Sequence, residues 1–136
     1  MIQRVARPIH VGVAALYVIG LLVQVYLAGM GVFAEASAFV THRDVGYVLT
    51  LLPVVLIVTA LAGRFGRWHV IASAVMVGQF ILQSVLVFQR DSAPAIAALH
   101  PVNGFLILLI GVWLAHDAWR EWRMNRRPST AEPMAS

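Results

Sequence analysis

The sequence has no cysteine and no lysine, and only 12% of its 136 residues are charged. The lack of cysteine excludes disulfide bonds, iron–sulfur clusters and thiolate metal sites. Soluble domains carry about a quarter charged residues, so the low charge argues against a soluble domain. The ten basic side chains are all arginines and give a net charge of +4. They flank apolar runs and form no patch interleaved with aromatic residues, which argues against nucleic-acid binding.

Apolar residues are abundant instead, at 60% of the chain, and the mean hydropathy is +0.81. A helix needs about 20 apolar residues to cross the hydrocarbon core of a bilayer. Short links between such helices make sequential neighbours antiparallel. The sequence therefore predicts an all-α integral membrane protein, an antiparallel four-helix bundle in the lipid bilayer. We expect helices at about 9–33, 40–62, 70–88 and 95–115, one domain over 1–127 and a disordered tail at 128–136.

The arginines also predict the orientation of the helices. Eight lie on one side of the expected membrane and two, Arg43 and Arg90, on the other. Cytoplasmic loops carry an excess of basic residues. We therefore expect a multi-pass protein of a bacterial-type inner (cytoplasmic) membrane, with the N-terminus, the second loop and the C-terminus in the cytoplasm.

Two halves of the chain can be aligned. The segments His42–Tyr47 and His100–Phe105 both read His-x-x-x-Gly-aromatic and open the second and fourth expected helices. The helices before them align Gln24 with Gln79. This pattern predicts two tandem helix-pair repeats, each with a glutamine in its first helix and a histidine at the outer start of its second.

His42 and His100 are the strongest candidates for chemistry, since an ionisable residue inside a membrane is a functional hypothesis by default. The second and fourth helices are diagonal in a four-helix bundle, so the two side chains can meet across the core. Haem iron accepts two imidazoles, and bundle cores commonly hold cofactors. Gly46 and Gly104 lie four residues later on the same helix faces, where they would leave room for a porphyrin. Zinc fits less well, because no third or fourth ligand accompanies the pair.

Other polar residues have two interpretations each. Arg43 and Arg90 could pair with haem propionates, or each could neutralise the adjacent Asp44 or Asp91. The glutamines, Gln24 and Gln79 among them, could line a cofactor or quinone pocket, or could make helix–helix hydrogen bonds, which we favour.

His10 and His69 begin the other two diagonal helices at the inner side. A second, inner haem between them is one hypothesis. No glycine follows either histidine at the fourth position, where Ala14 and Ser73 stand. We therefore favour an interfacial role for both side chains.

The segment from Gln24 to Trp113 resembles one four-helix half of haem A synthase. The resemblance lies in Gln-x-x-x-x-Gly near the end of one helix and His-x-x-x-Gly-Tyr at the start of the next. The segment beginning His100-Pro-Val-Asn-Gly also resembles a family of short bacterial four-helix membrane proteins of unknown function. In haem A synthase, paired helix-borne histidines near the outer face ligate haem, which implies this role for His42 and His100. The synthase's glutamate has no match, because Glu35 lies seven residues before His42.

These residues predict a b-type haem-binding membrane protein for electron transfer or haem carriage, without independent catalytic activity. Its partner would be a membrane redox protein or a larger complex. One alternative is a cofactor-free accessory subunit of a larger membrane complex, whose glycine-rich helices pack on a partner. A further alternative is a quinone-linked redox subunit that uses the glutamines.

Overall fold

The computed structural model describes residues 1–126, and the predicted tail at 128–136 lies outside these described residues. The described chain is all helical. Its elements are α1 (Ile2–Phe33), α2 (Ala38–Leu49), α3 (Leu51–Gly63), α4 (Arg67–Phe88), the short α5 (Pro94–Ala97) and α6 (Leu99–Met124). Four stretches are long and apolar enough to cross a membrane: Ile2–Phe33, Ala38–Gly63, Arg67–Phe88 and Pro94–Met124. The chain is therefore a multi-pass membrane protein with four candidate spans.

The predicted existence of four apolar spans is confirmed, but their bounds differ from the expected ones. The first helix begins at Ile2, and the fourth continues to Met124, nine residues beyond the expected end at Ala115. Both extensions carry charged residues and bring the helices to about 48 Å and 39 Å at 1.5 Å per residue. The hydrocarbon core is about 30 Å thick, so these helix ends reach the polar interface.

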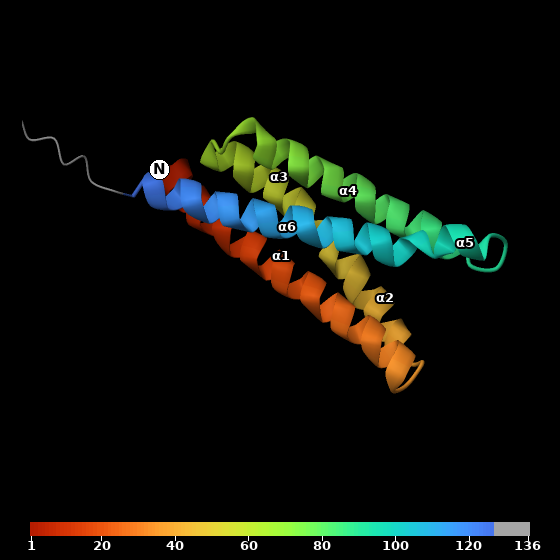
Figure 1. The fold of residues 1–136 in the computed structure, drawn as a ribbon. Coiled ribbons are helices and arrows are strands. Elements are labelled where there is room, and N and C mark those ends of the chain that lie inside the picture. The colour runs from red at the N-terminus through yellow and green to blue at the C-terminus, as the bar shows by residue number, and fades with distance from the viewer. Residues whose placement is uncertain (127–136) are drawn as a thin grey trace, which may run out of the picture.

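The second span bends where α2 gives way to α3. Pro53 lies in the first turn of α3, with its side chain fully buried. Proline has no N–H, so the carbonyl of Leu49 loses its helical hydrogen bond, and the proline ring crowds that carbonyl. Figure 1 shows that α2 turns away from the direction of α3 at this point.

The four spans run in alternating directions, and the bundle differs between its two ends (Figure 1). At the closed end, where α1 starts, α6 ends and residues 64–66 join α3 to α4, the helices lie together. At the split end, which holds residues 34–37 and 89–98, α1 and α2 diverge from α4, α5 and α6. Within residues 1–126, α2 packs only on α1 and α3.

A layer that is apolar except for the buried hydroxyl of Tyr17, which has no hydrogen-bond partner, fills the middle of the bundle. Its buried residues come from α1, α3, α4 and α6, and they are Ala14, Tyr17, Leu21, Leu56, Met76, Ile107 and Leu114. A smaller buried cluster of Ala60, Phe65 and Ala118 lies toward the closed end. Most large apolar side chains outside these clusters are exposed on the bundle surface, as expected for helices that face lipid.

Candidate functional site

His42 and His100 meet across the split end, although their helices do not pack on each other. Their ring centroids are 6.1 Å apart and the ring planes are inclined at 64°. Both side chains are partly buried. The structure therefore brings together the two residues that the repeat singled out, and we call them the split-end histidine pair.

Each member of the split-end histidine pair is oriented by the helix before it. Nδ1 of His42 lies 3.1 Å from the carbonyl oxygen of Gln24, and Nδ1 of His100 lies 3.3 Å from that of Gln83. A carbonyl oxygen can only accept, so Nδ1 carries the proton in both rings. In each neutral ring, Nε2 is then left with a free lone pair, which is the form of imidazole that binds a metal.

The glutamines differ from the predicted alignment by one helical turn. Gln83, and not Gln79, occupies in the second half the position that Gln24 has in the first. The backbone carbonyl of Gln79 instead accepts a hydrogen bond of 3.0 Å from Nδ2 of Asn103, which also donates to Oε1 of Gln83 at 2.9 Å. The apolar residues between these glutamines carry little register information, which is why the sequence did not reveal the shift.

Gly46 and Gly104 make room for glutamine side chains. A Cβ at Gly46 would lie 3.7 Å from Nε2 of Gln24, and one at Gly104 would lie 3.1 Å from Nε2 of Gln83. The glycines thus let each helix pair close over its own glutamine, which differs from the predicted direct opening toward a porphyrin. Nε2 of Gln24 is buried and has no hydrogen-bond partner.

Arg43 and Arg90 lie at the split end, as predicted, and each pairs with its neighbour in sequence. Arg43 lies 2.9 Å from Oδ1 of Asp44, and Nε of Arg90 lies 3.4 Å from Oδ2 of Asp91. All four side chains are exposed, so these pairs contribute little to stability. Of the two interpretations, pairing with the adjacent aspartate is the arrangement in the structure.

A second group of polar residues lies at the closed end, where the sequence predicted only interfacial histidines. His10 and His69 are 0% and 1% exposed, and Nε2 of His10 lies 3.2 Å from Nδ1 of His69. Both rings therefore lie between the helices and not on the surface of the bundle. Phe65 closes over both rings, with centroid distances of 4.3 Å and 4.8 Å.

Each of the four spans contributes to this group, which we call the closed-end polar cluster: Arg7, His10, Thr59, His69, Asp117 and Glu121. Nδ1 of His10 lies 2.9 Å from the hydroxyl of Thr59. Nε2 of His69 lies 3.3 Å from Asp117 and 3.5 Å from Glu121. Arg7 contacts Glu121 at 3.4 Å and donates to the carbonyl of Gly63 at 2.9 Å.

Two residues of this cluster, Asp117 and Glu121, were missed because the fourth helix was expected to end at Ala115. Their spacing of four residues places them on one helix face, and this was the available signal. In the described part of the chain, no group of three or more His, Cys, Asp or Glu residues is arranged to hold a metal ion. A metal held by the split-end histidine pair would therefore need its remaining ligands from a cofactor.

Comparison with known proteins found one family model that matches part of the chain. A model of a family of unknown function, DUF6220, matches residues 24–90. This stretch begins at Gln24, includes His42, α2, α3 and α4, and ends before His100. No curated protein and no solved structure matches the chain.

Proposed function

We propose that this chain is a b-type haem-binding membrane protein that transfers electrons or carries haem, with His42 and His100 as axial ligands. The observation that supports this most is the distance of 6.1 Å between the two ring centroids. A bond from an imidazole nitrogen to a metal is about 2 Å long, so two imidazoles on opposite faces of one ion have centroids about 6 Å apart.

The hydrogen bonds of the two rings support the same role. A histidine that binds a metal almost always donates its other N–H to a carbonyl or carboxylate, which fixes the ring and its tautomer. His42 and His100 both make this bond, to the carbonyl oxygens of Gln24 and Gln83. The equivalent bonds in the two halves also support the proposed pair of tandem helix-pair repeats.

The surroundings of the pair contain an unsatisfied polar group. At the end of the bundle where α1 and α2 diverge from α4, α5 and α6 (Figure 1), the buried amide nitrogen of Gln24 lacks a hydrogen-bond partner. Haem supplies one-electron redox chemistry when it is bound. The chain's part would be to hold the two imidazoles of His42 and His100 in fixed orientations through their hydrogen bonds to Gln24 and Gln83.

The charges support an orientation with the closed end in the cytoplasm. Seven of the nine described arginines lie at that end, and they are Arg4, Arg7, Arg64, Arg67, Arg120, Arg123 and Arg126. Three of these guanidinium groups lie within 6 Å of the ring centroids of Trp68, Trp119 and Trp122. Tryptophan anchors helices at either membrane interface, and the excess of arginine indicates that this one is cytoplasmic. The split end, with the proposed haem, then faces outward, toward a redox partner or a larger complex.

Absorption spectroscopy of the detergent-purified chain, oxidised and then reduced with dithionite, tests this function. We expect a sharp Soret band and resolved α and β bands on reduction, as two strong axial ligands produce. His42→Ala and His100→Ala should each abolish haem retention. His116→Ala is the matched control, because His116 is exposed on α6 at the closed end, and it should retain haem like the parent chain.

A chain that stays colourless after haem is supplied would overturn the proposal and favour the cofactor-free accessory subunit. A coloured chain whose spectrum is unchanged in both His42→Ala and His100→Ala would keep the cofactor but refute these ligands.

A further inference from the structure

The closed-end polar cluster contains a chain of hydrogen bonds whose direction can be worked out. The hydroxyl of Thr59 lies 2.8 Å from the carbonyl oxygen of Val55, to which it donates. A hydroxyl has a single proton, so its oxygen must accept the hydrogen bond from Nδ1 of His10, 2.9 Å away. His10 therefore carries its proton on Nδ1.

The direction of this bond sets the state of the next ring. A neutral imidazole has one N–H and one acceptor nitrogen, so Nε2 of His10 is an acceptor. Nδ1 of His69 lies 3.2 Å away and must donate to it. Nε2 of a neutral His69 is consequently left without a proton.

That nitrogen faces two carboxylates. Nε2 of His69 lies 3.3 Å from Oδ2 of Asp117 and 3.5 Å from Oε2 of Glu121, yet it is buried and makes no hydrogen bond. A bare nitrogen and two carboxylate oxygens are all acceptors, so their proximity is unfavourable. One added proton would turn the nitrogen into a charged donor between two anionic acceptors.

We propose that Nε2 of His69 is a proton-binding site that exchanges with the aqueous phase at the closed end through Asp117 and Glu121. These two side chains are 26% and 25% exposed and connect the buried nitrogen to water. Chains of histidine and carboxylate residues inside membranes commonly carry protons. The proposal does not depend on the presence of haem.

The other charges around the site come from two helices. Arg7 of α1 pairs with Glu121 at 3.4 Å, and Arg120 of α6 pairs with Asp117 at 3.3 Å. Thr59 is the contribution of α3 and is uncharged. The two arginines balance the two carboxylates, so a bound proton gives the cluster one net positive charge and adds a contact between α4 and α6.

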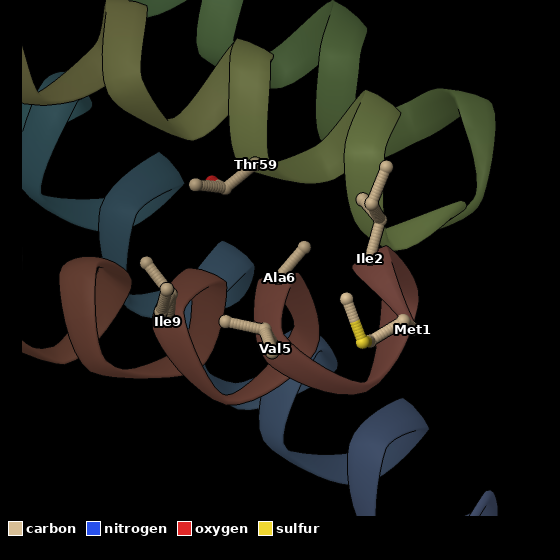
Figure 2. A pocket seen from close by; sticks show the side chains of 6 residues that line it. All are labelled: Met1, Ile2, Val5, Ala6, Ile9 and Thr59. Carbon is tan, nitrogen blue, oxygen red and sulfur yellow. The ribbon is translucent and has the colours of Figure 1, made fainter.

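The chain of hydrogen bonds stops at Thr59, which also lines a hollow of about 340 Å³ between the start of α1 and α3 (Figure 2). The other lining side chains are apolar: Met1, Ile2, Val5, Ala6 and Ile9. None of them can accept a proton from the threonine. The buried apolar layer of α1, α3, α4 and α6 lies between the cluster and the split end, so we infer that the cluster takes up and releases its proton at the closed end.

Nitrogen-15 NMR of the histidine rings, in the full chain in lipid nanodiscs between about pH 5 and 8, tests this inference. We expect His69 to change from one protonated nitrogen to two as the pH falls, and the His10 signals to shift in the same transition. His116 is the internal reference for an exposed histidine. If both buried rings keep neutral signals over this whole pH range while the protein stays folded, the proposal is wrong.

Two pairs of variants identify the partners. Asp117→Asn combined with Glu121→Gln should remove the doubly protonated His69 signal at the pH where the parent chain shows it, and an unchanged signal would refute the proposed route.

Thr59→Val should change the tautomer signals of His10, whereas Thr59→Ser keeps the hydroxyl and should preserve them. Equal effects of the two threonine variants would contradict the assigned direction of the hydrogen bonds.

Discussion

At the scale of single residues, Gly46 and Gly104 occupy equivalent positions in the repeat, but they differ in the room available for an added Cβ atom. Alanine is favoured over glycine in a helix by about 1 kcal/mol, and a methyl group added at Gly46 would meet only an ordinary contact at 3.7 Å. At Gly104 the contact is 3.1 Å, to the amide of Gln83, which also accepts a hydrogen bond from Asn103. We expect Gly46→Ala to raise the free energy of unfolding. The Gly104→Ala variant should have a free energy of unfolding about 1 kcal/mol lower than that of Gly46→Ala. SDS-induced unfolding in mixed micelles measures both, and equal stabilities would contradict this difference.

Arg7 connects the start of α1 to two other parts of the closed end. It donates to the carbonyls of Gly63 and Arg64 and contacts Glu121. Its side chain is only 18% exposed, so truncation leaves partly buried acceptors unpaired. We expect Arg7→Ala to lower the free energy of unfolding by about 2 kcal/mol. Arg4→Ala, at an exposed position one turn earlier in the same helix, is the control and should change it little in the same micelle assay.

The split-end histidine pair was predictable from sequence because its members lie at matching positions in two short motifs. The contact between His10 and His69 was harder to predict from the sequence. Their burial depends on Phe65, which folds back from the α3–α4 link over both rings. Gly63 permits this, since a Cβ there would lie 2.9 Å from the Phe65 ring. The position of Phe65 depends on the conformation of the α3–α4 link, in which Arg64 has a φ of 51°. The pattern of apolar residues in the sequence does not predict this conformation.

At the scale of elements, the bend before α3 positions α2 relative to α6. Pro53→Ala restores an N–H for the Leu49 carbonyl and should straighten the second span. Spin labels on Val40→Cys and Val102→Cys, both at exposed split-end positions, would report a changed distance by pulsed electron spin resonance. The absence of native cysteine makes this labelling specific.

A label pair on Leu61→Cys and Trp119→Cys at the closed end is the control for Pro53→Ala. We expect its distance to stay the same, because the closed-end polar cluster lies beyond the bend. Identical split-end distances in the parent and Pro53→Ala chains would show that packing on α1, and not proline, sets the direction of α2.

The four helices were predictable from hydropathy, whereas the end of α6 was not. Hydropathy falls at His116 and Asp117, which suggested an end at Ala115. The helix continues because Glu121 pairs with Arg7 of α1 and Asp117 pairs with Arg120 of α6, so neither carboxylate has to enter lipid unpaired. The acidic residues of α6 are thus compensated by ion pairs, which a hydropathy profile does not contain.

At the scale of the whole molecule, the arginine distribution predicts which links face outward. Single cysteines at Ser37 and Ser92 in the split-end links, and at Gly66 in the closed-end link, would test it. A Cβ at Gly66 would meet no atom within 4 Å, so Gly66→Cys should be tolerated. A membrane-impermeant maleimide should label Ser37→Cys and Ser92→Cys in intact cells, but Gly66→Cys only after permeabilisation. The reverse pattern would invert the proposed orientation.

The apolar middle layer has an electrical consequence. His10 and Gln24 lie fourteen positions apart on α1, which is about 21 Å at 1.5 Å per residue. The low-dielectric layer lies between them, and most of the membrane voltage would fall across it. Moving one elementary charge through a full 100 mV membrane voltage changes its energy by about 2.3 kcal/mol. A proton that reaches the closed-end histidines, or an electron that reaches the haem proposed at the split end, would cross little of that voltage from the nearer surface. A charge passed from one pair to the other would cross most of it.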